Sequence, residues 1–263
     1  MNINFFIKKI DSKFFNSFFY RKYHQILKED KLLNHRVEEF NHILCAQQNK
    51  NKNSKLNYLC DKYGSDKGEI DSLNNPYEWE SHTYTDIYDL MFRFQRKQIK
   101  LLLECGLGTN NPNLISSMGV NGKPGASLRV WRDYFPNALI LGVDIDKDIL
   151  FQEKRIKTYY CDQTNKKSIR KFCNVSNLKL KSIDIIIDDG LHEFFAGISF
   201  FESMFKYLST DGFYIIEDVI PEDIINYKNY FSNHIENLTI SFFNLNKDNK
   251  PAYDNRMILI RKN

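Results

Sequence analysis

The sequence has few cysteines, and their arrangement predicts neither a disulfide framework nor a zinc site. Its 263 residues include five, and no two form a Cys-x-x-Cys pair. This odd set without paired spacing indicates reduced thiols in a cytosolic compartment. No stretch approaches the ~18 consecutive apolar residues that a membrane span needs. Charged residues at Lys8, Lys9 and Asp11 stand where a signal peptide would continue its apolar core, so we expect a cytoplasmic protein.

A large excess of charge of either sign is also missing. Lys and Arg number 37, Asp and Glu 33, and the formal net charge is +4. Because a domain that binds nucleic acid through its charge usually has a pI above about 9, the pI of 8.6 predicts no nucleic-acid partner. With 42% hydrophobic and 27% charged residues the composition is globular, which excludes a collagen-like or wholly disordered chain.

Glycine and proline are absent from residues 1–48, where apolar residues recur at helical intervals and predict two or three helices. The polar stretch 49–54 is the best linker candidate. We therefore divide the chain into an N-terminal helical extension with its linker, residues 1–54, and a second domain, residues 55–263. Two roles remain open for the Phe-rich, basic extension: packing on the second domain or on another subunit, which we rank first, or peripheral contact with an anionic membrane. We expect a homo-oligomer.

Short apolar runs of strand length alternate with segments of helix length through the second domain. Runs without polar alternation are typical of parallel strands buried on both faces. The last two runs lie close together with Asn, Asp and Lys between them, which predicts a hairpin at the edge of the sheet. The pattern predicts an α/β fold with a doubly wound, Rossmann-like sheet that is mostly parallel and has an antiparallel edge hairpin. The runs are 99–104, 139–144, 156–161, 183–188, 213–217, 238–243 and 257–260.

The first three runs end in residues suited to binding a cofactor. Glu104 is followed by Gly106 and Gly108, and glycines at such a turn let a ligand approach the backbone. Asp144 closes the second run, where a Rossmann-type domain bonds ribose hydroxyls, and Asp162 follows the third, where a carboxylate can accept from an adenine amino group. Taken singly, a structural turn or a helix cap explains each feature as well.

A nicotinamide cofactor fits this loop less well. The third glycine of the dinucleotide fingerprint is replaced by Asn111, and Asp144 lies well beyond the ~20 residues that the fingerprint expects. Residues 109–127, rich in Asn, Gly and Pro, are interpreted as an inserted loop.

Two pairs of acids follow the next two strands, Asp188 with Asp189 and Glu217 with Asp218. These strands are neighbours in a doubly wound sheet, so their carboxylates converge beyond its carboxyl edge. Crowded like charges resist joint ionisation, and a divalent cation relieves the conflict. Oxygen ligands favour Mg²⁺, Mn²⁺ or Ca²⁺. We predict Asp189, Glu217 and Asp218 as metal ligands, with Asp188 nearer the cofactor. The alternative is that one acid of each pair faces solvent or a helix end, which we expect to hold for at least one of the four.

His192 follows Asp189 by three residues. A histidine accepts a proton near neutral pH and can act as a general base. An isolated histidine more often caps a helix or fills a surface groove, but beside an acidic metal cluster we predict a catalytic pair of His192 and Asp189.

Eight separated motifs follow one another along the second domain. They are Lys62–Gly68, His82–Tyr88, Glu104–Gly108, Gly125–Trp131, Gly142–Asp144, Cys161–Gln163, Asp188–His192 and Ile216–Asp218. With these motifs the sequence resembles class I S-adenosylmethionine-dependent methyltransferases and, more narrowly over residues 56–262, the macrocin and mycinamicin family of sugar O-methyltransferases. One departure is Leu191, where the family commonly has a small polar residue.

The resemblance implies a methyltransferase sheet and assigns roles to these motifs. S-adenosylmethionine would be held by the residues Tyr63, Ser65, Lys67, Glu104, Gly106, Gly108, Arg129, Asp144, Asp162, Gln163 and Asp188. Mg²⁺ or Mn²⁺ would be bound by Asp189, Glu217 and Asp218, with His192 as base. For the first 50 residues the resemblance implies nothing.

The predicted function is metal-assisted O-methylation of a sugar hydroxyl. The substrate would be a small-molecule sugar or nucleotide sugar, as a nucleotide-linked or glycan-linked precursor of a bacterial surface polysaccharide (capsule) or of a glycosylated metabolite. Two alternatives remain: methylation of a phosphoramidate or phosphate oxygen on a capsule precursor, and a non-catalytic scaffold that binds the cofactor and regulates a partner.

Overall fold

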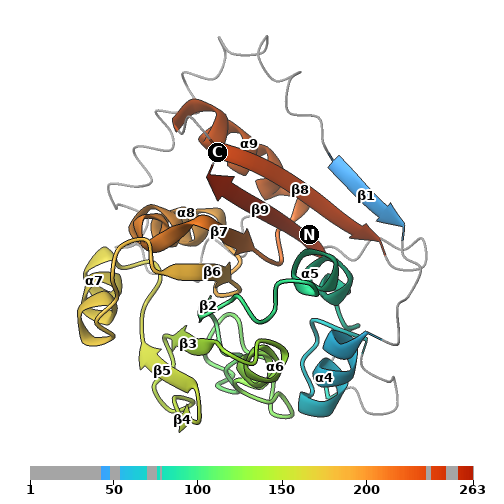
Figure 1. Ribbon diagram of the computed structural model, residues 1–263, viewed down its shortest axis with the longest axis vertical. Helices are drawn as coiled ribbons and strands as arrows, with labels where there is room; N and C mark the ends of the chain where they lie inside the picture. Colours follow the sequence, from blue (N-terminus) through green and yellow to red (C-terminus); the bar gives the residue numbers. More distant parts are fainter. Residues whose placement is uncertain are drawn as a thin grey trace. The chain divides into compact units, whose positions relative to one another are not determined.

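The computed structural model describes the following residues (Figure 1): 43–47, 54–69, 76, 77, 79–234, 238–246 and 254–262. The helices predicted for residues 1–42 lie outside this set, so the helical extension and its boundary at residue 54 stay predictions. The sequence predicts helices throughout residues 1–48, and in one described segment this is wrong. Ile43–Gln47 forms a strand, β1. Its backbone pairs in parallel with strand β8 (Leu238–Asn246), a distant partner that local spacing does not reveal.

In the described part of the chain, nine strands form one sheet in the order β1-β8-β9-β7-β6-β2-β3-β5-β4 (Figure 1). Strands β7, β6, β2, β3 and β5 are parallel, whereas β9 pairs antiparallel with both β7 and β8. The predicted fold is thus confirmed, and the expected hairpin is β8 with β9. The further strands are β2 (Leu101–Cys105), β3 (Leu139–Asp144), β4 (Gln152–Glu153), β5 (Ile156–Tyr160), β6 (Ile183–Asp188), β7 (Leu208–Ile216) and β9 (Arg256–Lys262).

Helices cover both faces of the sheet, which is why its central strands are apolar at successive positions. Leu102 and Leu103 are neighbours in β2 and pack into different hydrophobic clusters. The first cluster takes side chains from α4 (Lys55–Tyr63), α5 (Tyr84–Phe92) and α6 (Ala126–Tyr134), and the second from α7 (Lys166–Val175), α8 (Phe194–Met204) and α9 (Pro221–His234). A short 3-10 turn, η3 (Phe205–Tyr207), links α8 to β7.

The order of the strands reverses between β2 and β6, because the chain runs outward from β2 through β3 and then returns to the other side. At such a switch point the loops beyond the carboxyl ends of two neighbouring strands separate and leave room for a ligand. Among the described helices, none is long and apolar enough to cross a membrane.

Helix α4 delivers a further segment to this edge. The Ser54 hydroxyl accepts a hydrogen bond from the Asn57 amide and starts the helix. The helix ends at Gly64, whose φ of 74° is the left-handed conformation that glycine adopts at helix ends. The chain then turns, and Ser65 to Lys67 reach the carboxyl ends of the strands.

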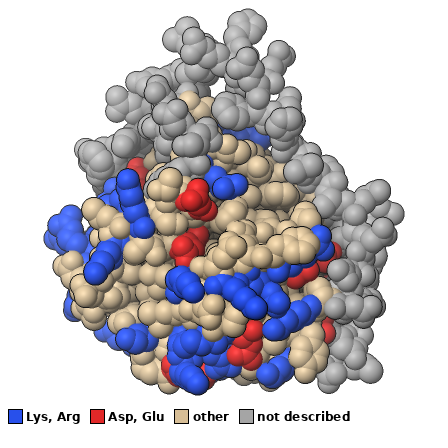
Figure 2. Space-filling model, in the orientation of Figure 1, with Lys and Arg blue, Asp and Glu red and all other residues tan. Residues whose placement is uncertain are grey.

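Charged side chains are dispersed over the surface. On the face drawn in Figure 2, Lys and Arg lie among acidic and uncharged residues. Lys and Arg predominate over Asp and Glu on this face.

Candidate active site

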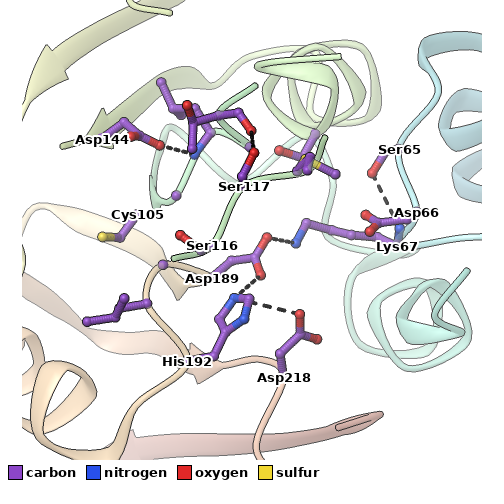
Figure 3. Close-up of a pocket in the computed structure, with 18 of the residues that line it drawn as sticks. Ser65, Asp66, Lys67, Cys105, Ser116, Ser117, Asp144, Asp189, His192 and Asp218 are labelled. Atoms are coloured by element: carbon purple, nitrogen blue, oxygen red, sulfur yellow. Dashed lines mark hydrogen bonds and ion pairs between the residues drawn. The ribbon is translucent and has the colours of Figure 1, made fainter. Parts of the chain in front are cut away.

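A cavity of about 580 Å³ lies beyond the carboxyl ends of the parallel strands, at the switch point. The loops after β2, β3, β5, β6 and β7 line it, together with residues 65–67, 77, 79–82 and 84. In Figure 3, Asp144 and Cys105 lie on one side of this cavity and Ser65 and Asp66 on the other, with Asp189 and His192 between them. Residues from two sides of the cavity thus surround Asp189 and His192.

The glycine loop after β2 packs directly against the loop after β6. Gly106 has a φ of 92°, and a Cβ atom on it would lie 1.8 Å from the Asp189 carbonyl oxygen. Any side chain at this position would push the two loops apart. Next to it, the Leu107 amide donates to Asp144 Oδ2 at 2.7 Å, so the acid at the end of β3 fixes the loop. Burial raises the pKa of Asp144.

Asp189, His192 and Asp218 form the centre of the cavity. His192 Nε2 lies 3.3 Å from Asp189 Oδ1 and 3.6 Å from Asp218 Oδ2. One nitrogen or oxygen atom of each of the three residues lies within 4.8 Å of those of the other two. His192 and Asp218 both have positive φ, 58° and 52°. Residues other than glycine rarely adopt this backbone conformation, and where they do it often marks a functional site.

Tyr84, at the start of α5, holds Asp218 in place. Its hydroxyl donates to Asp218 Oδ1 at 2.5 Å and accepts a hydrogen bond from the Asp218 amide at 3.2 Å. The strained backbone of Asp218 is thus fixed by a buried side chain from a distant part of the sequence.

The two acids decide the charge of His192. Burial alone would lower the pKa of this histidine, but the carboxylates of Asp218 and Asp189 raise it to about 10. The pKa of Asp189 lies well below its ordinary value, because Lys67 and His192 outweigh the effect of its burial. His192 therefore carries a proton at neutral pH, and accepting another group's proton requires a further positive charge near the acids.

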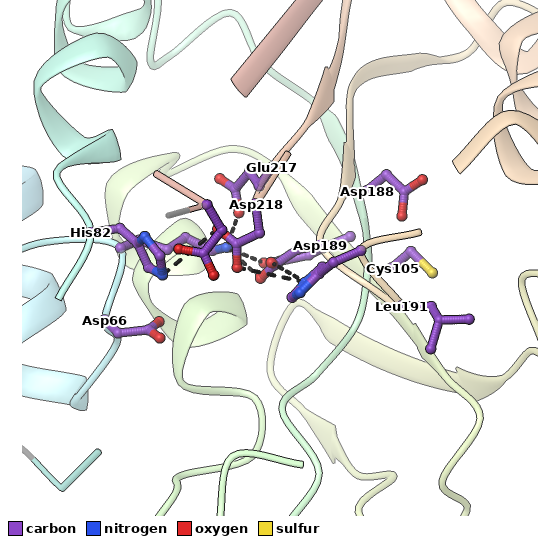
Figure 4. A network of polar contacts seen from close by, with 12 residues as sticks. Asp66, His82, Cys105, Asp188, Asp189, Leu191, Glu217 and Asp218 are labelled. Atoms are coloured by element: carbon purple, nitrogen blue, oxygen red, sulfur yellow. Dashed lines mark hydrogen bonds and ion pairs between the residues drawn. The ribbon is translucent and has the colours of Figure 1, made fainter. Parts of the chain in front are cut away.

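Lys67 is the buried cation of the site. Its ammonium lies 2.5 Å from Asp189 Oδ2 and 3.4 Å from Glu104 Oε1, and it donates directly to Glu217 Oε2. Burial would lower the pKa of Lys67, but the carboxylates of Asp189, Glu217 and Glu104 raise it well above its ordinary value. The remaining oxygen of Glu217 accepts from the Tyr88 hydroxyl. Figure 4 shows Glu217 and Asp218 on the same side of Asp189.

No family model matches the chain. Among curated proteins, it is 31% identical over 158 residues to the 8-demethyl-8-alpha-L-rhamnosyl tetracenomycin-C 2'-O-methyltransferase of Streptomyces olivaceus. The aligned residues cover 60% of this chain and 36% of the relative. It is also 31% identical over 160 residues to the demethylmacrocin O-methyltransferase of Streptomyces fradiae, 59% of this chain and 37% of the relative. The chain thus spans little more than a third of the length of these relatives.

Among solved structures, the MycE methyltransferase from the mycinamycin biosynthetic pathway, in complex with Mg and SAH, matches with a TM-score of 0.53 and 22% identity. The match covers 80% of this chain and 54% of that structure. This chain has the class I methyltransferase fold. In sequence it resembles the macrocin and mycinamicin sugar O-methyltransferases.

The site of this methyltransferase-fold chain has the donors that a hard divalent cation takes. Asp189 and Asp218 offer carboxylate oxygens, the ligands that Mg²⁺ and Mn²⁺ prefer, and both line the cavity. His192 completes the group, but its ring nitrogen is a donor that softer metals favour. Of the three predicted metal ligands, Asp189 and Asp218 belong to this group, whereas Glu217 contacts Lys67.

On the glycine-loop side, the cavity also offers groups for an organic cofactor. Gln163 donates to Asp188 Oδ1 at 3.0 Å and accepts from the Leu191 amide at 2.8 Å, which ties the loop after β5 to the loop after β6. Asp188 Oδ2 is buried and accepts no hydrogen bond from the described residues, and burial raises the pKa of Asp188 to about 6. Gln163 lines the cavity, whereas Asp188 is buried behind it.

Most of the residues predicted from the sequence line the cavity, and five do not. Tyr63 donates to Asp133, and Arg129 pairs with Glu153, so both take part in contacts outside the cavity. Glu104 and Asp188 are buried at the ends of their strands, and Glu217 contacts Lys67. The predicted residues that line the cavity are Ser65, Lys67, Gly106, Gly108, Asp144, Asp162, Gln163, Asp189, His192 and Asp218.

Sequence reasoning did not single out the wall opposite the glycine loop. The Trp79 indole donates to Asp66 Oδ2 at 2.9 Å and stacks on Tyr77 with ring centres 5.1 Å apart. His82 stacks on Tyr84 at 4.9 Å, and its Nε2 lies 3.7 Å from Asp218 Oδ1. In Figure 4, His82 and Asp66 lie on one side of Asp218, away from Leu191. The motif His82–Tyr88 was a signal, but its spacing does not predict contact with a strand end.

Proposed function

We propose that this protein is a metal-assisted, S-adenosylmethionine-dependent O-methyltransferase that acts on a sugar hydroxyl. One observation carries the proposal: a histidine and two carboxylates meet in one cavity with the glycine loop of a methyltransferase fold. The relatives support it, since they are named as O-methyltransferases of rhamnosyl tetracenomycin C and of demethylmacrocin. The MycE complex with Mg and SAH supports the same pair of cofactors.

S-adenosylmethionine would bind on the glycine-loop side. Gly106 and Gly108 both have positive φ and present backbone without side chains to the cavity. Asp144 and Asp162 line the same side and would accept from the ribose hydroxyls and the adenine amino group. Gln163 would fix the loop that carries Asp189.

A divalent cation would be held by Asp189 and Asp218. When bound, it supplies positive charge that stabilises a developing alkoxide and offsets the two carboxylates that raise the pKa of His192. His192 lies against both acids and is placed to take the proton of an acceptor hydroxyl.

The protein's main task is alignment, because the sulfonium methyl group is already activated. The acceptor oxygen bonds to the methyl carbon, the carbon–sulfur bond breaks to leave S-adenosylhomocysteine, and the hydroxyl proton passes to His192. The acceptor would lie on the opposite wall, where Trp79 offers an aromatic face and Asp66 and His82 offer polar atoms. A sugar has apolar C–H faces and ring hydroxyls that suit such a wall.

The carrier of this sugar is a finer part of the proposal. The relatives are named for sugars carried by larger metabolites. We infer an acceptor sugar linked to a nucleotide, a glycan or a metabolite scaffold.

The test is transfer of a labelled methyl group from S-adenosylmethionine to a panel of nucleotide sugars, simple glycosides and sugar phosphoramidates. We expect a sugar hydroxyl to be methylated, with a rate ~10²–10⁴-fold lower in His192→Ala and no turnover in EDTA. Asp211→Asn, an exposed acid on β7, is the matched control and should keep full activity. Undiminished turnover in His192→Ala would contradict the base, and turnover in EDTA would contradict the metal.

Two other outcomes identify the alternatives. Transfer only to a phosphoramidate or phosphate oxygen would replace the sugar hydroxyl by that acceptor. Tight binding of S-adenosylmethionine without turnover of any acceptor would favour a regulatory scaffold.

A further inference from the structure

Lys67 lies in a cage of three carboxylates, contributed by Glu104 at the end of β2, Asp189 after β6 and Glu217 after β7. The residue is only 3% exposed, so water contributes little to solvating its ammonium. The three acids therefore provide nearly all of its solvation.

Asp189 is shared between this cage and the candidate metal site. Its Oδ2 accepts from Lys67 at 2.5 Å, and its Oδ1 faces His192 Nε2 at 3.3 Å. Figure 3 shows the Asp189 carboxylate between the Lys67 ammonium and the His192 ring. A cation bound by Asp189 and Asp218 would thus lie close to a fixed positive charge and would find one Asp189 oxygen occupied.

We propose that Lys67 competes with the divalent cation for Asp189 and Glu217 and so holds down the affinity of the site for metal. This inference rests on the proposed function, since it requires a cation at this site. It also accounts for Glu217, which the sequence predicts as a metal ligand and which contacts Lys67 here. Glu217 becomes available to a metal only when the ammonium leaves.

The cage would persist without the ammonium, because other donors hold its acids. The Trp131 indole donates to Glu104 Oε2 at 2.8 Å, and the Tyr88 hydroxyl donates to Glu217 Oε1. Glu104 Oε1 accepts no hydrogen bond from the described residues. Removal of the lysine charge would leave anchored carboxylates with free oxygens beside Asp189, and such oxygens attract a hard cation.

The experiment measures binding of Mn²⁺ alone to the full chain by titration calorimetry and by the Mn²⁺ electron paramagnetic resonance signal. We expect Lys67→Met to bind Mn²⁺ at least about tenfold more tightly than the unaltered chain, and Lys67→Arg, which keeps the charge, to stay within about threefold of it. Lys62→Met is the matched control, because Lys62 also pairs with a carboxylate, Asp133 at 3.4 Å, but does not line the cavity. It should leave the affinity unchanged.

Circular dichroism shows whether each variant folds. If Lys67→Met does not fold, the single variant Glu104→Gln is compared with the double variant Glu104→Gln, Lys67→Met. In the double variant the cage has lost one charge of each sign. The same gain of at least about tenfold is expected between these two. Equal or weaker Mn²⁺ binding without the lysine overturns the inference while leaving the proposed function intact. Absence of Mn²⁺ binding in the unaltered chain and in every variant overturns both.

Discussion

Replacement of Tyr84 by Phe removes one buried hydroxyl and tests how Asp218 is held. The hydroxyl donates to Asp218 Oδ1 at 2.5 Å and accepts from the Asp218 amide at 3.2 Å. The phenylalanine ring keeps the stacking on His82, whose ring centre lies 4.9 Å away. The substitution removes these two hydrogen bonds and two longer contacts of the hydroxyl, with the carbonyl oxygens of Asp254 at 3.4 Å and Arg256 at 3.5 Å, without opening a cavity.

The expected loss of stability follows from those two bonds. A hydrogen bond to a charged group contributes ~1.5–3 kcal/mol, and a buried donor left without a partner costs ~1–3 kcal/mol. Because both bonds involve the same hydroxyl, the two effects are not fully additive. We expect the free energy of unfolding to fall by about 3 kcal/mol.

Urea unfolding, followed by circular dichroism, measures this loss. Tyr58→Phe is the control, because Tyr58 is 65% exposed and should change stability by less than ~0.5 kcal/mol. Mn²⁺ affinity should fall as well, since Asp218 has a strained backbone that Tyr84 fixes. A loss below ~1 kcal/mol in Tyr84→Phe, with Mn²⁺ binding unchanged, would refute the view that Tyr84 positions Asp218.

Three further predictions concern the loops and the histidine. Gly106→Ala should lose at least ~3 kcal/mol more stability than Gly119→Ala in urea unfolding. Both glycines have positive φ, but of the two only Gly106 would bring a Cβ atom against backbone. Equal losses of stability in the two variants would contradict this. Asp144→Asn should weaken binding of S-adenosylhomocysteine at least about tenfold in equilibrium dialysis, because an amide has only one acceptor oxygen and cannot accept from both the Leu107 and the Asp146 amides as the carboxylate does; unchanged affinity would remove Asp144 from the cofactor site. In metal-free protein, His192 has a pKa of about 10 against an ordinary 6.5, so its stabilisation is complete below about pH 6.5 and is lost as the pH rises through 10. Between pH 7 and 10 the free energy of unfolding should therefore fall more in the unaltered chain than in His192→Gln, and parallel pH profiles would contradict the raised pKa.

Much of the fold could be predicted because its central strands are buried on both faces. The run Ile183–Asp188 has apolar residues at four of its six positions, and the structure places them in clusters on both sides of β6. Burial on both faces leaves a signal in the local sequence. Strand β1 left no such signal, because its partner is β8, almost 200 residues later, and its own spacing is also compatible with a helix.

The candidate site was also predictable in part, because of the geometry of parallel strands. Parallel strands end at one edge, so acids that follow β6 and β7 must lie near each other, and Asp189 and Asp218 do. The direction of each side chain was not predictable. Glu217 and Asp218 are adjacent in sequence, yet one contacts Lys67 and the other lies near His192.

The sequence by itself determined the class of fold, the glycine loop and the convergence of acids at one edge, because these depend on short patterns and on the geometry of parallel strands. The tertiary structure decided which charges meet. Lys67 and Tyr84 come from the segment before the first central strand, and only folding brings them to Glu217 and Asp218. Electrostatic interaction depends on distance and burial, and neither quantity is written in the order of the residues.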